Sequence, residues 1–410
     1  MLLVALALIG IPAAVLRIGC VGNSCRSDAA AVAAPAPFCS LPADLRALIT
    51  AGTYDGRSPD VIGVGGSAPV VTDGVPWPSE GASGQPGSVG LAFVGRGIRS
   101  GRLPAGVSLD QVAPTLEPLL GLRRPHPEVR AGTAISGVVE PRARTPLVVV
   151  VVEKGIGSPQ SSPRLSDLGT GVHGAAGSAE TGSVPDDPTA VEATIGTGGL
   201  PSQHGITGTL IRNENGNVVR AFGPGSPQPV IAALGDDLDR TTGGATKIGL
   251  VSTAVGDAGL TGDAWYGTGP VRDRSVSGVA NPAAAVRGFL SQGWGTDETP
   301  DLLAVALDGS AGSDRNAVAS MLHEVFHAVP DATVVVTGTG HAHAGKIATV
   351  PTPTGIDTVV GGGVFLERSE GATTSAQDIV VALKADTAPD GSALFDDAFA
   401  SYAVRFGRYC

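Results

Sequence analysis

The chain has few aromatic residues, few methionines and no cluster of basic residues. The lack of clustered basic residues excludes the most, because it bears on the class of partner. Aromatic residues make up 4% of its 410 residues, and there are two methionines. A net charge of −11 without clustered Lys and Arg argues against nucleic acid as a partner, because phosphate-binding surfaces need concentrated positive charge. Sixty glycines and 31 prolines indicate many tight turns, whereas 42% hydrophobic residues argue against a disordered chain.

The first 40 residues predict a membrane segment followed by a linker. Residues 2–16 are continuously apolar and end at Arg17, which is the length of a signal-peptide core and short for a full membrane span. We expect a signal or anchor segment at 1–18, retained rather than removed, and a Cys-containing Ala/Pro linker at 19–40. The domain at 41–410 is then expected on the extracytoplasmic face of the cell membrane, or secreted if the segment is removed.

Four cysteines accompany this segment and the end of the chain, at Cys20, Cys25, Cys39 and Cys410. An even number outside the membrane favours disulfides, and four thiols allow three pairings. We predict Cys20 with Cys25 and Cys39 with Cys410, the second of which requires the two ends of the folded domain to be neighbours. The alternative is that Cys20 and Cys25 are free thiols on the linker.

The most informative stretch is LVVVVVEKGIGS, residues 147–158, in which Leu147 and five valines precede Glu153, Lys154 and Gly155. A run of β-branched residues suits a strand buried on both faces, and such strands belong to parallel sheets covered by helices. Ligands of open α/β sheets bind beyond the carboxyl ends of the strands, so Glu153 points at any active site. The alternative is an ordinary buried strand followed by a turn.

Strands and helices alternate along the rest of the chain, which predicts an α/β fold with a central, mostly parallel sheet flanked by helices. The expected helices are 41–51, 108–121, 280–293 and 314–328, and the expected strands are 90–98, 246–255, 301–308 and 333–337, with a hairpin turning at Asn215 and Gly216.

Two segments resemble a known family. Asp110–Thr115, followed by Leu120–Leu122, resembles a helix late in the catalytic domain of the alkaline phosphatase superfamily, which includes sulfatases and type I phosphodiesterases. TIGTGGLPSQHGITG, residues 194–208, is similar to the segment of type I phosphodiesterases and nucleotide pyrophosphatases in which Thr-Gly and a proline precede His-Gly-Ile. The resemblance implies an alkaline-phosphatase-like fold and hydrolysis of phosphodiesters or phosphate esters.

The resemblance also implies a nucleophilic hydroxyl about nine residues before the Thr-Gly pair. That position is Pro188, so the neighbouring Thr189 is the predicted nucleophile, with Thr181 and Ser183 as further possibilities. The asparagine that usually follows the nucleophile in the family is absent, which weakens the case for nucleophilic catalysis.

The family holds two zinc-like ions with carboxylates and imidazoles, because the ions activate the nucleophile and neutralise charge on the transferring group. By resemblance, Glu153 and Asp308 are the metal ligands that remain, and the cofactor is zinc or another divalent metal, with no cofactor at all as the alternative. The other ligand positions correspond to Gly312, Thr339, Gly340 and Ser83, with His341 and His343 displaced. An incomplete two-metal site is therefore predicted.

Two hypotheses follow from the resemblance. The first is a phosphoester hydrolase with a rebuilt site that uses Glu153, Thr189 and Asp308. The second is a degenerate domain that binds a small phosphoester ligand or another partner without turnover. The Ala-Pro-Thr helix precedes the central strand here, although it comes late in the superfamily, so the resemblance also implies a circular permutation with adjacent chain ends.

An alternative from a different class is a zinc metallopeptidase, because His323, Glu324 and His327 form a literal HExxH. Histidines four residues apart lie on one helical face and can share a zinc ion while the glutamate activates water. However, the apolar residues of the same helix form a stripe that leaves both histidines on the polar side. This pattern favours a solvated helix face.

Overall fold

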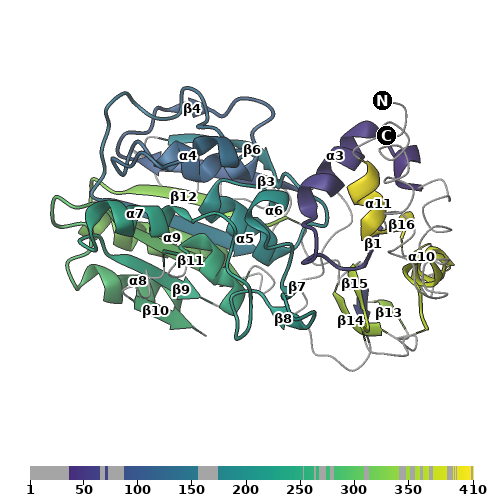
Figure 1. Ribbon diagram of the computed structural model, residues 1–410. Coiled ribbons are helices and arrows are strands. Elements are labelled where there is room, and N and C mark those ends of the chain that lie inside the picture. Colours follow the sequence, from purple (N-terminus) through teal and green to yellow (C-terminus); the bar gives the residue numbers. More distant parts are fainter. Residues whose placement is uncertain are drawn as a thin grey trace, which may run out of the picture.

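The computed structural model describes residues 37–64, 70–72, 87–155, 174–252, 254–262, 265–266, 274–277, 281–308, 314–340, 348–350, 356–360, 363–368, 373–385, 391, 393, 395–407 and 410. These residues form a large α/β unit and a small unit that contains the first and last described segments of the chain (Figure 1). The predicted anchor, Cys20 and Cys25 lie outside the described residues. No helix within the described ranges is long and apolar enough to cross a membrane.

The large unit is built on an eight-stranded sheet. Its strands are β3 (Ser88–Gly95), β4 (Gly101–Arg102), β5 (Leu147–Lys154), β6 (Gly174–Glu180), β9 (Ile248–Ser252), β10 (Arg274–Ser277), β11 (Asp301–Asp308) and β12 (Thr333–Gly338). They lie in the order β10-β9-β11-β5-β12-β3-β6-β4, and the first five are mutually parallel. β3 runs antiparallel to both of its neighbours. The predicted α/β fold with a central, mostly parallel sheet is therefore confirmed.

Helices cover both faces of this sheet. They are η2 (Leu109–Gln111), α4 (Val112–Leu116), η3 (Pro127–Val129), α5 (Pro188–Thr197), α6 (Pro201–His204), α7 (Leu234–Thr242), η5 (Val255–Leu260), α8 (Pro282–Leu290) and α9 (Asp314–Ala328). α9 and β11 have the predicted bounds. The helix predicted to reach Gly121 ends at Leu116, because Pro118 has no N–H to donate to a further helical turn.

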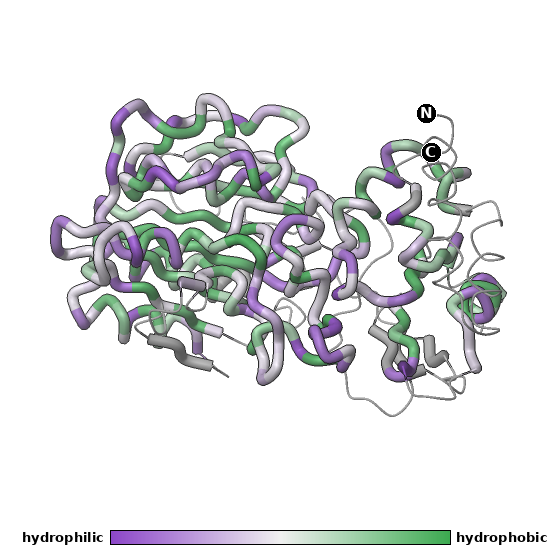
Figure 2. Tube along the Cα trace, in the orientation of Figure 1, coloured by the Kyte–Doolittle hydropathy of each residue, from purple (hydrophilic) through white to green (hydrophobic). Residues whose placement is uncertain are grey.

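The valine strand lies at the centre, since β5 pairs with β11 on one side and β12 on the other. All eight of its residues are buried. Leu147, Val149 and Val151 share a hydrophobic cluster with α8 and α9, while the alternate valines share a cluster with α4, α5 and α7. Figure 2 shows hydrophobic residues concentrated inside the large unit and hydrophilic residues at its outer turns. The two-faced burial expected of five successive valines is confirmed.

The small unit joins the beginning and the end of the described chain. Its elements are η1 (Pro37–Ser40), α3 (Ala43–Gly52), β1 (Val61–Val64), β14 (Ile356–Val360), β15 (Gly363–Leu366), α10 (Ala376–Ala385), β16 (Asp397–Ala400) and α11 (Ser401–Phe406). The four strands form an antiparallel sheet in the order β14-β15-β1-β16. A separate parallel pair consists of β2 (Val70–Thr72) and β13 (Ala348–Val350).

The two ends are joined by the predicted disulfide between Cys39 and Cys410, whose Cα atoms are 5.5 Å apart. Phe38 is 1% exposed, and its ring packs edge-on against Phe399 with the centroids 5.3 Å apart. The packed part of the chain therefore begins before residue 41, within the segment predicted to be a linker. The first and last described segments are therefore neighbours, as the predicted disulfide requires.

Buried arginine contacts connect the two units. The predicted hairpin consists of β7 (Leu210–Arg212) and β8 (Val218–Arg220), paired antiparallel. From the end of β7, Arg212 Nη2 donates to Asp60 Oδ2 at 2.5 Å and to the Leu366 carbonyl at 3.0 Å in the small unit. The Arg212 side chain is 1% exposed, so this charge is held almost entirely inside the protein.

Candidate functional site

The carboxyl ends of the central strands bring two of the predicted site residues onto neighbouring positions. Glu153 pairs in register with Leu307 of β11 and with Gly338 of β12, and Asp308 pairs with Lys154. Glu153 and Asp308 therefore lie in the last two positions of adjacent parallel strands, one register position apart, at the carboxyl edge of the sheet. Glu153 is 3% exposed.

Lys154 follows Glu153 and, by strand alternation, points to the opposite face of the sheet. There its Nζ lies 3.0 Å from Asp257 Oδ1 in η5, with the two side chains 3% and 1% exposed. The other oxygen of Asp257 accepts the Ala254 N–H at 2.9 Å, which fixes the carboxylate at the start of η5. This buried ion pair was not predicted, although a lysine at the end of an otherwise apolar strand is a signal for a buried acidic partner.

Thr189 lies in the first turn of α5, on the same face as the Lys154–Asp257 pair. Asp187 caps this helix, because its Oδ1 accepts the Thr189 N–H at 2.9 Å and the Ala190 N–H at 3.4 Å. The hydroxyl of Thr209 donates to the same Asp187 oxygen at 3.2 Å, and Thr189 Oγ1 lies 3.2 Å from Thr209 Oγ1. The Thr189 hydroxyl is thus the outer member of a chain of hydrogen bonds that ends on the capping carboxylate.

The backbone of η5 packs directly on the Thr189 side chain. A Cβ atom built on Gly256 would lie 2.4 Å from Thr189 Oγ1, so only glycine permits this approach. Thr189 is 5% exposed. Because Gly256 precedes Asp257, the same segment covers the Thr189 hydroxyl and neutralises Lys154.

The segment between β6 and α5 holds the two other predicted hydroxyls and a carboxylate that sequence reasoning missed. Thr181 Oγ1 accepts the Gly87 N–H at 3.3 Å, and Ser183 is 1% exposed. Asp186 packs against the end of β12, since a Cβ atom on Gly340 would lie 1.9 Å from Asp186 Oδ2. Residues 181–187 therefore cross the carboxyl edge of the sheet. Short sequence motifs do not predict this crossing.

Thr339 stands where the resemblance implies an aspartate ligand, and it stabilises the turn after β12. Its N–H donates to the Glu153 carbonyl at 3.2 Å, and its Oγ1 accepts the Gly155 N–H at 3.0 Å. One backbone bond and one side-chain bond of Thr339 thus link the ends of β5 and β12. Gly312, Ser83, His341 and His343 lie outside the described residues.

His204, in the His-Gly-Ile motif, is a neutral structural residue. Its Nδ1 accepts the Ile206 N–H at 3.1 Å, and its Nε2 lies 3.1 Å from Thr194 Oγ1. Burial, with a further contribution from the charge of Arg57, lowers the pKa of His204 to about 3. A histidine with this pKa is neutral near pH 7, so His204 is not an imidazolium acid there.

The HExxH residues lie on the outer face of α9. Val318, Met321, Leu322, Val325 and Val329 are buried against the sheet, whereas His323 and His327 are exposed. Glu324 Oε1 accepts a hydrogen bond from Arg287 Nη2 of α8 at 2.7 Å. The glutamate is therefore engaged in an ion pair between two helices.

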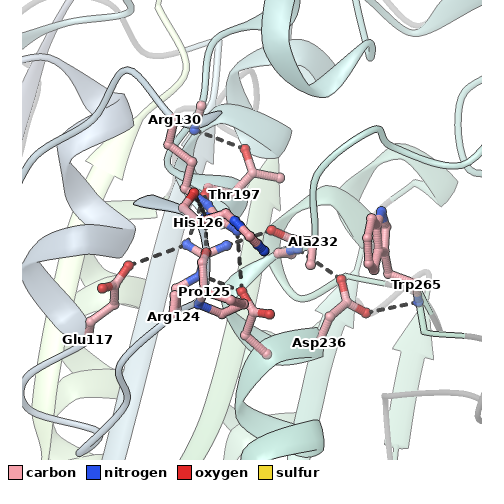
Figure 3. Close-up of polar contacts among 12 residues, drawn as sticks. Glu117, Arg124, Pro125, His126, Arg130, Thr197, Ala232, Asp236 and Trp265 are labelled. Atoms are coloured by element: carbon pink, nitrogen blue, oxygen red, sulfur yellow. Dashed lines mark hydrogen bonds and ion pairs between the residues drawn. The ribbon is translucent and has the colours of Figure 1, made fainter. Parts of the chain in front are cut away.

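A second buried polar cluster joins the ends of α5 and α7 (Figure 3). Arg124 donates through Nε to Asp237 Oδ2 at 2.6 Å, and through Nη1 and Nη2 to the carbonyls of Thr197 and Ala232 at 2.8 and 2.5 Å. Burial raises the pKa of the adjacent Glu117, while the charge of Arg124 opposes that rise. Arg124 thus donates its hydrogen bonds to carbonyls and a carboxylate of the same chain. The cluster therefore stabilises the packing of α5 against α7.

Among the residues that the structure describes, two of the predicted ligand positions are carboxylic acids. These are Glu153 and Asp308, whereas Thr339 is a hydroxyl bound in a turn. Across the described ranges, no group of three or more His, Cys, Asp or Glu side chains is placed to hold a metal ion. No protein-family model matches the chain, and a search of curated proteins also finds no match.

Proposed function

We propose that this chain is an extracytoplasmic, non-catalytic member of the alkaline phosphatase superfamily, which binds a small phosphoester at the carboxyl edge of its sheet without hydrolysing it. The observation that carries this proposal is the position of Thr189. In a hydrolase of this kind, the nucleophilic hydroxyl must approach the phosphorus closely and must lose its proton.

Thr189 meets neither requirement. The backbone at Gly256 occupies the space beside its hydroxyl, so a phosphorus atom cannot reach it unless η5 moves. Its hydrogen-bond partner is the hydroxyl of Thr209, which is not a base. The carboxylate of Asp187 accepts hydrogen bonds from Thr209 and from two backbone N–H groups of α5, so it acts as the cap of this helix.

The positive charge next to the site, on Lys154, is also neutralised within the protein. Lys154 is the cation at the end of the central strand, and its charge is balanced by Asp257 at 3.0 Å. A lysine that stabilised a transferring phosphoryl group would be directed at the ligand. The paired Lys154 and the covered Thr189 support the proposal that the chain keeps the fold of the superfamily and does not catalyse its reaction.

Hydrolysis of bis(p-nitrophenyl) phosphate in the presence of Zn²⁺ tests the proposal. We expect no turnover above the buffer rate for the wild type, Glu153→Ala or Thr189→Ala. Turnover by the wild type that Glu153→Ala or Thr189→Ala abolishes would show a catalytic site and overturn the proposal. Calorimetric titration with the same diester tests binding: heat from a saturable site supports the proposal, and its absence contradicts it.

A further inference from the structure

We propose that His323 and His327 form a surface binding site for one divalent transition-metal ion of the Ni²⁺, Cu²⁺ and Zn²⁺ class. The two residues are four apart on α9, a helix of 15 residues, and both are exposed. Their ring centroids are 6.2 Å apart and the ring planes are tilted by 38°. This separation follows from helix geometry, which places i and i+4 side chains on the same face.

Small side-chain rotations bring the rings into chelating distance. With metal–nitrogen bonds of about 2.0–2.1 Å, two imidazoles on one ion have centroids roughly 5 Å apart. The rings must therefore approach by about 1 Å, starting from the 6.2 Å separation. Within the described residues neither ring makes a hydrogen bond that would oppose this rotation, and both face solvent.

The helix that carries the two histidines is firmly held, so the ligands are presented at a fixed spacing. Val318, Met321, Leu322 and Val325 of α9 are each 2% exposed or less and pack in the hydrophobic cluster under the helix. Chelation then requires ordering of two side chains only, without rearrangement of the backbone. Pre-organisation of this kind lowers the entropic cost of binding.

The glutamate between the two histidines is already paired with a neighbouring helix. Glu324 is 27% exposed, and its Oε1 accepts a hydrogen bond from Arg287 Nη2 at 2.7 Å. The two opposite charges balance, so the imidazole nitrogens, and not a free carboxylate, define the proposed site.

The donor atoms determine the class of metal. Imidazole nitrogen suits Zn²⁺, Cu²⁺ and Ni²⁺, whereas Ca²⁺ and Mg²⁺ prefer oxygen ligands. With two protein nitrogens, the remaining coordination positions are left to water. The site is separate from the proposed phosphoester site, because α9 leads from the carboxyl end of β11 back to the amino end of β12. Its last turns therefore lie toward the sheet edge opposite Glu153.

Calorimetric titration with Ni²⁺ tests this site on the full chain. The titration is carried out on a His341→Ala/His343→Ala background, so that the other closely spaced histidine pair cannot contribute. We expect one Ni²⁺ per chain, and adding His323→Ala or His327→Ala should weaken binding at least about tenfold. Adding His126→Ala, which removes an exposed histidine beside Glu128, should leave the affinity unchanged.

The result that would overturn the inference is Ni²⁺ binding that is absent from the background chain, or that survives His323→Ala and His327→Ala with unchanged affinity. Circular dichroism of each variant checks the fold, which these exposed substitutions should not disturb. Phosphodiester assays play no part in this test, so failure of the metal site and failure of the proposed function remain distinguishable.

Discussion

The side chains of Lys154 and Asp257 form an ion pair inside the protein, with Nζ and Oδ1 3.0 Å apart and exposures of 3% and 1%. Removing one partner of a buried pair leaves the other charge without compensation. We expect Lys154→Met to lower the free energy of unfolding by about 3–5 kcal/mol, measured by urea denaturation.

The matched control for Lys154→Met is Arg96→Gln, which breaks the pair with Asp331 at a similar 2.8 Å but with exposures of 54% and 60%. We expect that change to cost at most about 1 kcal/mol, because solvent screens exposed pairs. Equal effects of the two substitutions would contradict a buried pair beneath the candidate site.

Arg212 is expected to hold the two units together. Arg212→Met removes the donor to the Leu366 and Gly216 carbonyls and the buried one of the two arginines bonded to Asp60, and we predict a loss of about 3–5 kcal/mol in the free energy of unfolding. Arg368→Gln removes a second, 54% exposed arginine from the same Asp60 and should cost at most about 1 kcal/mol. If Arg368→Gln were the more damaging change, the assigned role of Arg212 would be wrong.

His204 predicts a pH dependence of stability. Its pKa is lowered from 6.5 to about 3 in the folded protein, so between these pH values the unfolded chain binds more protons. The free energy of unfolding is therefore not reduced by His204 above pH 6.5. It decreases as the pH falls from 6.5 toward 3, because only the unfolded chain takes up a proton on this side chain. From pH 7.5 to 5.0 the wild type should lose about 2 kcal/mol more than His204→Asn, whose amide oxygen can still accept the Ile206 N–H. Parallel pH profiles of the two proteins would refute a buried neutral imidazole.

The disulfide between Cys39 and Cys410 should stabilise the small unit, because it joins residues 371 positions apart in sequence. We expect Cys39→Ser to cost about 2–5 kcal/mol in unfolding free energy and to increase hydrogen exchange in α3 and α11. Cys20→Ser/Cys25→Ser is the control for loss of thiols and should leave exchange in these helices unchanged. Unaltered exchange in Cys39→Ser would show that packing alone holds the chain ends.

Local patterns predicted the large unit well. Five valines in succession suit a strand buried on both faces, and β5 has this position because helices cover both sides of the sheet. The bounds of α9 were readable because its apolar residues recur at helical spacing and Pro330 follows it. The disulfide was predictable from cysteine number and placement.

The small unit and most of the candidate site could not be predicted in this way. β1 pairs with β15 and β16, about 300 or more residues further along the chain, and no local signal specifies such pairing. Gly256 of η5 packs on the Thr189 hydroxyl, and Asp257 of the same helix pairs with Lys154. η5 is far from both residues in sequence. Such contacts depend on how loops pack across the sheet edge, which spacing within one motif does not encode.

The most direct test of the account is the rate of bis(p-nitrophenyl) phosphate hydrolysis with Zn²⁺, compared between the wild type and Thr189→Ala. The His323→Ala/His327→Ala background should be used, so that surface-bound metal plays no part. Because the Thr189 hydroxyl is covered, we expect both proteins to hydrolyse the diester no faster than buffer alone. A wild-type rate well above buffer that disappears in Thr189→Ala would contradict the account.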